Sequence, residues 1–73
     1  MTPEQCRAAR GWLDLSQAEL AEAAKVSLST VRDFEKGRRT PIGNNLTAMV
    51  AALSAHGIEF QDNGITGPRS EPV

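Results

Sequence analysis

Apolar residues recur at spacings of three and four positions in four segments of this chain. The first segment spans Pro3 to Leu13, and the second follows Ser16 and stops at Lys25. The third runs from Leu28 to Lys36, and the fourth from Asn44 to His56. This spacing gathers apolar side chains along one side of an α-helix, where they can pack against a core. The pattern therefore predicts four short amphipathic helices.

Residues that begin and end helices stand at the borders of these segments. Thr2 with Gln5, and Ser16 with Glu19, have the spacing of a capping box, in which each side chain bonds the main-chain N–H of the other residue. Ser27 is a third candidate for an N-cap. Glycines, which end helices readily, follow the third and fourth segments as Gly37 and Gly57.

Beyond the fourth segment the helical spacing gives way to alternation. Apolar and polar residues alternate from Ile58 to Phe60, and Asn63-Gly64 is a typical tight-turn pair. We expect a short strand over Ile58–Phe60 that has no partner strand in its own chain. The tail from Thr66 onward is polar and rich in proline, and we expect it to fray.

Length and composition limit what such a chain can be. Its 73 residues are enough for about one small domain. We expect an all-α domain over residues 1–57 and an extension over residues 58–73. The low aromatic content, 4%, leaves no room for a large cofactor pocket, so no cofactor is expected. No run of about 18 apolar residues and no apolar signal core is present, which indicates a cytoplasmic protein without a membrane anchor.

The residues that carry enzyme chemistry are scarce. Cys6 is the only cysteine and His56 the only histidine, so neither an internal disulfide nor a cysteine and histidine metal cluster is expected. No glycine-rich phosphate loop and no HExxH spacing occurs. We therefore expect neither an enzyme nor a bound metal.

The third helix is predicted to have two different faces. At about 100° per residue, Val31 and Phe34 fall on one side, where they can pack. The other side spreads over an arc of roughly 140° and carries Leu28, Ser29, Arg32, Asp33 and Lys36. This mixture of a branched apolar group, a hydroxyl, a guanidinium and a carboxylate can contact base edges in a DNA major groove. The alternative is an ordinary solvated helix face.

Positive charge is concentrated around this helix, although the whole chain has a net charge of −1. Between Lys25 and Arg39 stand five basic and two acidic residues, which gives a local charge of +3. Acidic residues occur in the C-terminal part as Glu59, Asp62 and Glu71. DNA affinity depends on the phosphates that a surface neutralises rather than on total charge, so this asymmetry favours DNA binding.

Residues over some 25 positions resemble the helix-turn-helix of the Cro and CI-type phage repressors and of the Xre-like regulator family. The resemblance rests on Gln17, Leu20-Ala21, Val26-Ser27, Val31, Glu35, Gly37, Arg39 and Pro41. It implies a compact four-helix, lambda-repressor-like domain. It also implies that the third helix lies in the major groove with its N-terminal residues at base edges, while the second helix crosses the DNA backbone.

The resemblance assigns roles to particular residues of this chain. Base contacts are implied for Leu28, Ser29, Arg32 and Asp33. Gln17 is implied at a phosphate or at the half-site edge, and Thr30 toward the backbone side. Arg38 and Arg39 follow the reading helix and are expected at phosphates, as are the free N–H groups near Asn44 and Asn45. The whole expected DNA-binding set is Gln17, Ser27, Leu28, Ser29, Thr30, Arg32, Asp33, Lys36, Arg38, Arg39 and Asn44.

Other positions either depart from the family pattern or carry a structural role. Lys25 stands where the turn between the two motif helices usually has a glycine, and we expect it to adopt a left-handed conformation. Arg10 and Glu35 match an ion pair that joins the first and third helices in the resembled repressors. The alternative for this pair is two solvated surface charges.

These observations predict a sequence-specific regulator of transcription that binds double-stranded DNA, most simply a small repressor acting as a homodimer on a near-palindromic operator. The alternative is a protein-interaction module, such as an antitoxin or an antiactivator. We expect dimer contacts in the fourth helix and the strand after it. The small residues predicted on the outer side of this helix are Ala48, Ala51, Ala52 and Ala55. These alanines can instead be plain helix formers, and Ile58 and Phe60 can instead pack on their own domain.

Overall fold

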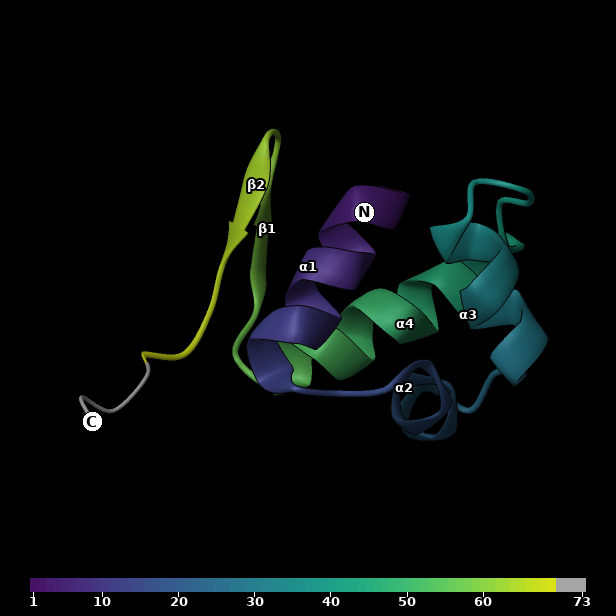
Figure 1. The fold of residues 1–73 in the computed structure, drawn as a ribbon, viewed down its shortest axis with the longest axis horizontal. Coiled ribbons are helices and arrows are strands. Elements are labelled where there is room, and N and C mark those ends of the chain that lie inside the picture. Colours follow the sequence, from purple (N-terminus) through teal and green to yellow (C-terminus); the bar gives the residue numbers. More distant parts are fainter. Residues whose placement is uncertain (70–73) are drawn as a thin grey trace.

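The chain folds as four helices followed by a two-stranded antiparallel sheet (Figure 1). The computed structural model describes residues 1–69, so Ser70 to Val73, including the acidic Glu71 and the end of the predicted tail, lie outside the described residues. The elements are α1 (Pro3–Leu13), α2 (Gln17–Ala24), α3 (Leu28–Glu35), α4 (Gly43–Ala55), β1 (Glu59–Gln61) and β2 (Gly64–Thr66). The predicted fold class is confirmed.

The helix ends follow the capping residues of the sequence. Both capping boxes are present, with the side chains of Thr2 and Ser16 each accepting a hydrogen bond from the main chain three residues later. Ser27 accepts from the Thr30 N–H at the start of α3. The third and fourth helices each end one residue earlier than predicted, because Lys36 and His56 are C-caps and not members of the helices. The fourth helix also begins one residue earlier than predicted, at Gly43.

One hydrophobic core joins all four helices to the chain that follows them. Its largest fully buried side chains are Leu20, Met49, Leu53, Ile58, Val31 and Cys6. The helix α2 packs against both α3 and α4, while α1 packs against α3 and β2. Within residues 1–69, none of the helices is both long enough and apolar enough to cross a membrane.

The outer face of α4 differs from the one expected. Ala48 and Ala52 pack against the core cluster, and Ala51 and Ala55 are exposed. The core-facing stripe of this helix is therefore wider than predicted, and α2 packs against α4. A continuous surface of four alanines, which we expected to receive a second chain, is not formed.

The strand after α4 has a partner in its own chain, which corrects the expectation of an unpaired strand. β1 and β2 are antiparallel, with Glu59 opposite Thr66, Phe60 opposite Ile65 and Gln61 opposite Gly64. The turn lies at Asp62-Asn63, one residue earlier than expected, and neither turn residue has a positive φ. The reason is tertiary: the Gln5 side chain on α1 donates to the carbonyls of Gln61 and Gly64 and fixes the closing pair of the hairpin.

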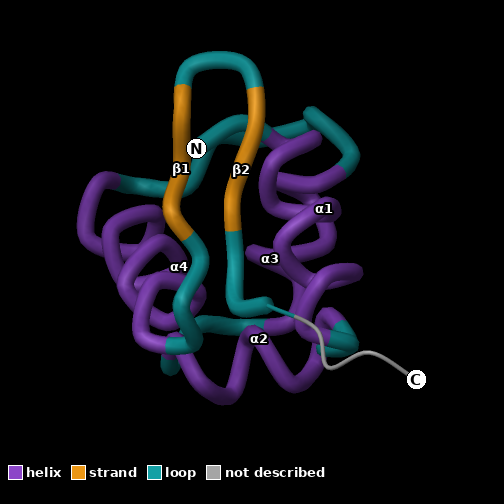
Figure 2. The backbone as a smooth tube through the Cα atoms, turned by 90° about the vertical axis from the view of Figure 1, so that its left-hand side faces the viewer, coloured by secondary structure: helices purple, strands orange, loops and turns teal. Residues whose placement is uncertain are grey.

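The segment after β2 packs on α1 rather than fraying from Thr66 as expected. The indole Nε1 of Trp12 donates to the carbonyl of Pro68 at 2.9 Å. A Cβ on Gly67 would lie 2.7 Å from the Trp12 ring and 2.9 Å from Ile58, so a side chain at this position would clash. Trp12 thus contacts this C-terminal segment. The hairpin lies across α1 at the end of the molecule away from α3 (Figures 1 and 2).

Candidate nucleic-acid interface

The turn between α2 and α3 sets the angle at which α3 leaves the core. Lys25 has φ +59° and lies in the left-handed region, as the sequence predicted for the residue in the place of the usual glycine. The Val26 N–H donates to the Ala21 carbonyl at 3.0 Å, which closes the end of α2. Ser27 then caps α3 two residues after Lys25, so both helices are held by local hydrogen bonds.

One face of α3 is buried and the other meets solvent. Val31, Phe34 and Glu35 are buried against α1 and α2. Leu28, 37% exposed, lies on the solvent face although it is apolar. The exposed residues of α3 and its C-cap that belong to the expected DNA-binding set are Leu28, Ser29, Arg32 and Lys36. Asp33 and Thr30 are half-buried at the border of this face.

The start of α3 carries three linked hydroxyl groups. The Ser27 hydroxyl lies 2.7 Å from the Thr30 hydroxyl and 3.1 Å from that of Ser29, and it also accepts from the Thr30 N–H. These contacts restrict the rotamers of Ser27 and Thr30, so their hydroxyls are held in place before any ligand arrives. Ser29 remains exposed and can direct its hydroxyl outward.

A short basic segment follows α3 directly. Gly37 has φ +72°, and the Arg38 N–H donates to the Asp33 carbonyl at 2.9 Å, which turns the chain back along the helix. Arg38 and Arg39 are both exposed. Within residues 1–69, no salt bridge is formed by the five basic residues Lys25, Arg32, Lys36, Arg38 and Arg39. Their positive charge is therefore not compensated by nearby carboxylates in ion pairs.

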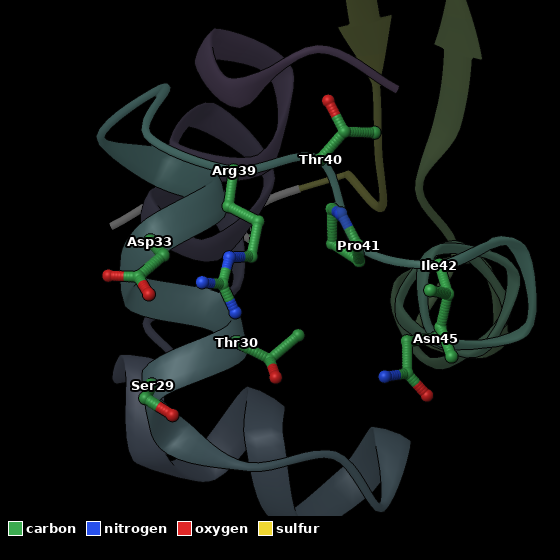
Figure 3. A pocket seen from close by; sticks show the side chains of 8 residues that line it. All are labelled: Ser29, Thr30, Asp33, Arg39, Thr40, Pro41, Ile42 and Asn45. Atoms are coloured by element: carbon green, nitrogen blue, oxygen red, sulfur yellow. The ribbon is translucent and has the colours of Figure 1, made fainter.

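A groove of about 220 Å³ lies between α3 and the start of α4. In Figure 3 the Arg39 side chain extends along α3 toward Thr30 and Asp33, and Asn45 faces it from the first turn of α4. Ile42, 70% exposed, forms part of the α4 side. Asn44, which the sequence placed at DNA, is exposed on the same turn but does not line the groove. The other lining residues are Ser29, Thr40 and Pro41.

Four of these lining residues are outside the DNA-binding set expected from the sequence: Thr40, Pro41, Ile42 and Asn45. Asn45 and Ile42 come from the α3–α4 connection and the turn after it, where helical spacing carries no information about which side chains point back to α3. The signal that was available is at the cap: Ile42 is the N-cap of α4, and an apolar side chain cannot satisfy the free N–H groups of the first turn.

Behind the solvent face of α3, a buried ion pair joins α3 to α1. The Arg10 guanidinium donates two hydrogen bonds to the Glu35 carboxylate, both at 2.6 Å, and Glu35 is 3% exposed. Cys6 donates to the same carboxylate at 3.1 Å and Gln17 at 3.0 Å. Arg7 also donates to the Glu35 main-chain carbonyl. Every buried side-chain nitrogen and oxygen in residues 1–69 has a hydrogen-bond partner.

Burial and hydrogen bonding shift the pKa values of Glu35, Arg10 and Cys6 in this cluster. Burial opposes ionisation of Glu35, but the hydrogen bonds from Arg10, Cys6 and Gln17 outweigh burial and lower the pKa of the carboxyl below its usual value. The bond to Glu35 raises the pKa of Arg10. Burial, and then the bond to Glu35, raises the pKa of the Cys6 thiol. The thiol therefore stays protonated and unreactive.

The Gln17 side chain is hydrogen-bonded inside the domain and is not a free surface side chain. It is the first residue of α2, and its amide nitrogen donates to Glu35 inside the domain. The amide thus joins the start of α2 to the buried pair and is half-buried. Its remaining N–H and its carbonyl oxygen are the groups left for DNA.

The comparisons with known proteins agree with this arrangement. A family model described as Helix-turn-helix matches residues 7–57, which is more than half of the chain. The matched range includes α2, the turn, α3 and α4, and ends before the hairpin. A search among curated proteins gives no match.

Proposed function

The chain belongs to the Xre/Cro/CI-type helix-turn-helix family, a family of DNA-binding regulators, and from this premise we propose that it is a sequence-specific transcriptional repressor acting as a homodimer on a near-palindromic operator. The observation that carries the proposal is the solvent face of α3. It presents Leu28, Ser29 and Arg32 beside basic residues that form no salt bridge within residues 1–69.

The reading helix supports contacts to base edges. Ser29 and Arg32 are exposed on α3, and Asp33 stands one turn after Ser29 on the same side. A guanidinium can bond guanine in two places, and a carboxylate can accept from the cytosine amine. We assign Leu28, Ser29, Arg32 and Asp33 to base recognition.

The flanking residues support contacts to phosphates. Arg38 and Arg39 are exposed after α3, and Lys36 caps the helix. The first N–H groups of α4 have no side-chain cap, so they are free to bond a phosphate near Asn44. Arg39 lines the groove together with Thr30 of α3. Its guanidinium is therefore placed between α3 and the phosphate that we assign to the start of α4.

We infer a dimer from the short length of α3, the helix that we assign to base recognition. A helix of eight residues contacts only a few base pairs, and a two-fold pair of such helices about one DNA turn apart, ~34–36 Å, doubles the recognised sequence. Bound upstream of or over a promoter, such a dimer blocks access of the transcription machinery.

Selection of bound sequences from a random double-stranded DNA pool tests the proposal. We expect enrichment of one near-palindromic site and an affinity that falls steeply with salt, as counterion release requires. A reporter gene placed behind the selected site should lose expression when the protein is present. Absence of any enriched sequence, together with binding to a partner protein that is insensitive to salt, would replace this proposal by the interaction-module alternative.

A further inference from the structure

We propose that Leu28 recognises the C5 methyl group of a pyrimidine in the DNA major groove, supplied by a thymine or by a 5-methylcytosine. The inference rests on the proposed function, because it names the chemical group that one residue of α3 selects when this helix lies in the groove. Part of the sequence specificity then comes from an apolar contact and not from hydrogen bonds.

The exposure of Leu28 provides the first argument. Within residues 1–69, three large hydrophobic side chains are exposed: Trp12, Leu28 and Ile42. Trp12 lies at the hairpin end, where its indole bonds the Pro68 carbonyl, and Ile42 lies at the start of α4. Leu28, 37% exposed, is therefore the one on α3. A ligand that covers it releases water from an apolar surface, which is favourable.

The helix α3 is attached to the domain without the outer part of Leu28. Val31 and Phe34 of the same helix are buried in the core, and the Arg10–Glu35 pair holds its last turn. Packing therefore accounts for the inner part of the Leu28 side chain and leaves its outer part for a ligand.

The hydroxyl groups around Leu28 are engaged with one another. The Ser27 hydroxyl lies 2.7 Å from that of Thr30 and 3.1 Å from that of Ser29. The Leu28 side chain stands among them and has no hydrogen-bonding group. The group on a base edge that an apolar side chain matches is the C5 methyl of thymine, which lies in the major groove. A 5-methylcytosine presents the same methyl on the same ring carbon.

The place of Leu28 in the helix suits a base contact. Leu28 is the first residue of α3, and the N-terminal residues of a reading helix contact base edges. The chain just before it is held by the bond from the Val26 N–H to the Ala21 carbonyl, at 3.0 Å, and by the Ser27 cap. The Leu28 side chain thus starts from a fixed main-chain position, as the selection of one base pair requires.

Arg32 extends the recognised sequence to a neighbouring base pair. It is exposed four residues after Leu28, which places their Cβ atoms about 5–6 Å apart. Successive base pairs are about 3.4 Å apart along the DNA axis. A guanidinium can bond the O6 and N7 atoms of guanine. We therefore expect the methyl-bearing pyrimidine within one or two base pairs of a guanine in each half-site.

The first experiment uses the wild-type chain and replaces each thymine of the selected operator, one at a time, by deoxyuridine. This replacement removes the C5 methyl and keeps base pairing. At one thymine of each half-site we expect binding to weaken about 3- to 5-fold, the effect of exposing one buried methyl group. If no thymine of the half-site shows such a loss, the proposal is overturned.

Two substitutions then assign the effect to Leu28. Leu28→Ala withdraws the branched end of the side chain, so it should bind the thymine and deoxyuridine sites equally. Leu28→Met keeps an apolar side chain of similar volume and should still prefer thymine. Each comparison is made between two DNAs with one protein, so a loss of stability affects both affinities alike. A Leu28→Ala protein that keeps the wild-type preference would overturn the proposal.

The salt dependence separates a methyl contact from a phosphate contact. A methyl contact neutralises no charge, so Leu28→Ala should lower affinity for the operator without a change in the salt slope. A reduced slope would show that the substitution moves α3 away from the phosphates, and Leu28 would then be a positioning residue for the helix and not a reader of the methyl group.

The two sources of the methyl group are distinguished at the thymine that the first experiment identifies. A cytosine·guanine pair is placed there, with and without methylation of the cytosine at C5. We expect methylation to strengthen wild-type binding about 3- to 5-fold and to leave Leu28→Ala unaffected. Tighter binding of thymine than of 5-methylcytosine assigns the contact to thymine, and the reverse order assigns it to methylated DNA. No response to methylation contradicts the proposal.

The outcome for the unmodified operator separates this inference from the proposed function. If selection yields no bound sequence, the assignment of α3 as a DNA reader fails. If a sequence is selected and bound but no C5 methyl affects its affinity through Leu28, DNA reading stands and the methyl contact is wrong.

Discussion

The two ends of this molecule are built on opposite principles. At one end, α3 exposes polar and charged side chains while hydrogen bonds behind it hold the helix in place. At the other end, Ile58 is buried and Phe60 and Ile65 are half-buried, while Glu59, Gln61 and Thr66 are exposed. The comparison indicates that one end presents polar side chains on a firmly held helix, whereas the other end is held by contacts between residues far apart in the sequence.

The ends also differ in charge. The segment from Lys25 to Arg39 carries a local charge of +3, and the hairpin carries Glu59 and Asp62. Positive charge near α3 and negative charge far from it orient the chain toward DNA and keep the hairpin away from phosphates. A test of either end should therefore leave the other end unaffected, apart from effects on overall stability.

The largest expected effect comes from the buried pair behind α3. Arg10→Met or Glu35→Leu alone leaves one charge without its partner and should cost about 3–5 kcal/mol in the free energy of unfolding. The double variant should recover part of this loss, although Cys6 and Gln17 also lose their acceptor. Urea denaturation of the three variants and the wild type measures these differences in the free energy of unfolding. A double variant no more stable than the worse single variant would contradict a buried, coupled pair.

Acid should weaken the same pair. The pKa of Glu35 is lowered in the folded chain, so the carboxylate contributes stability above its unfolded pKa and loses it as pH falls through the lower folded value. Thermal melts from pH 7 downward should show a decrease in Tm in the acidic range, and the decrease should be smaller in Glu35→Gln. An equal decrease in both proteins would place the acid sensitivity elsewhere.

The next effect belongs to the hairpin end. Ile58 is 2% exposed and packs beside Trp12 and Gly67, so Ile58→Ala leaves a cavity in the core and should cost about 2–4 kcal/mol. At a temperature where the variant is still folded, half-site affinity should stay close to that of the wild type. Loss of half-site affinity in a folded Ile58→Ala protein would show that the two ends are coupled.

A smaller effect distinguishes the residues of the DNA end from one another. Arg32→Ala should cost about 1–3 kcal/mol on the selected site and relax base preference at one position. Arg38→Ala, exposed just after the helix, should weaken all sequences alike and reduce the salt slope by about one unit. Binding to a set of single-base operator variants, measured at several salt concentrations, separates the two. Equal loss of specificity in both variants would mean that the reading face is misplaced.

The smallest effect concerns the turn that orients α3. Lys25 adopts φ +59°, a conformation that costs a non-glycine residue about 1 kcal/mol, so Lys25→Gly should raise stability by up to that amount. Lys25→Ala is the control, because it removes the same charge and keeps the strain. If both variants shift the denaturation midpoint equally, relief of backbone strain is not the cause.

Local chemistry made most of the helical part predictable. Capping boxes, helical spacing and stop glycines act between residues three or four positions apart, so the four helices and the two faces of α3 can be read from the sequence. The left-handed Lys25 was implied by the resemblance to the helix-turn-helix family. The helix ends differ by one residue, because a C-cap and the last helical residue have the same local signals.

Part of the candidate interface was beyond such reasoning. The groove between α3 and α4 depends on the path of the connection from Arg38 to Ile42, which no periodicity describes. The side chains of Ile42 and Asn45 were therefore not expected to line it, although main-chain N–H groups near Asn45 were expected at a phosphate. In the same way, the internal partner of Gln17 is Glu35, 18 residues away.

The sequence by itself determined the four helices and the side-chain chemistry of α3, because those depend on contacts within a few residues along the chain. Tertiary structure alone decided the C-terminal end. Contacts 56 to 59 residues apart, from Gln5 to the hairpin carbonyls and from Trp12 to Pro68, moved the turn, paired β1 with β2 and placed the tail on α1. Such contacts form only when packing brings residues that are distant in the sequence together, so no local sequence pattern predicts them.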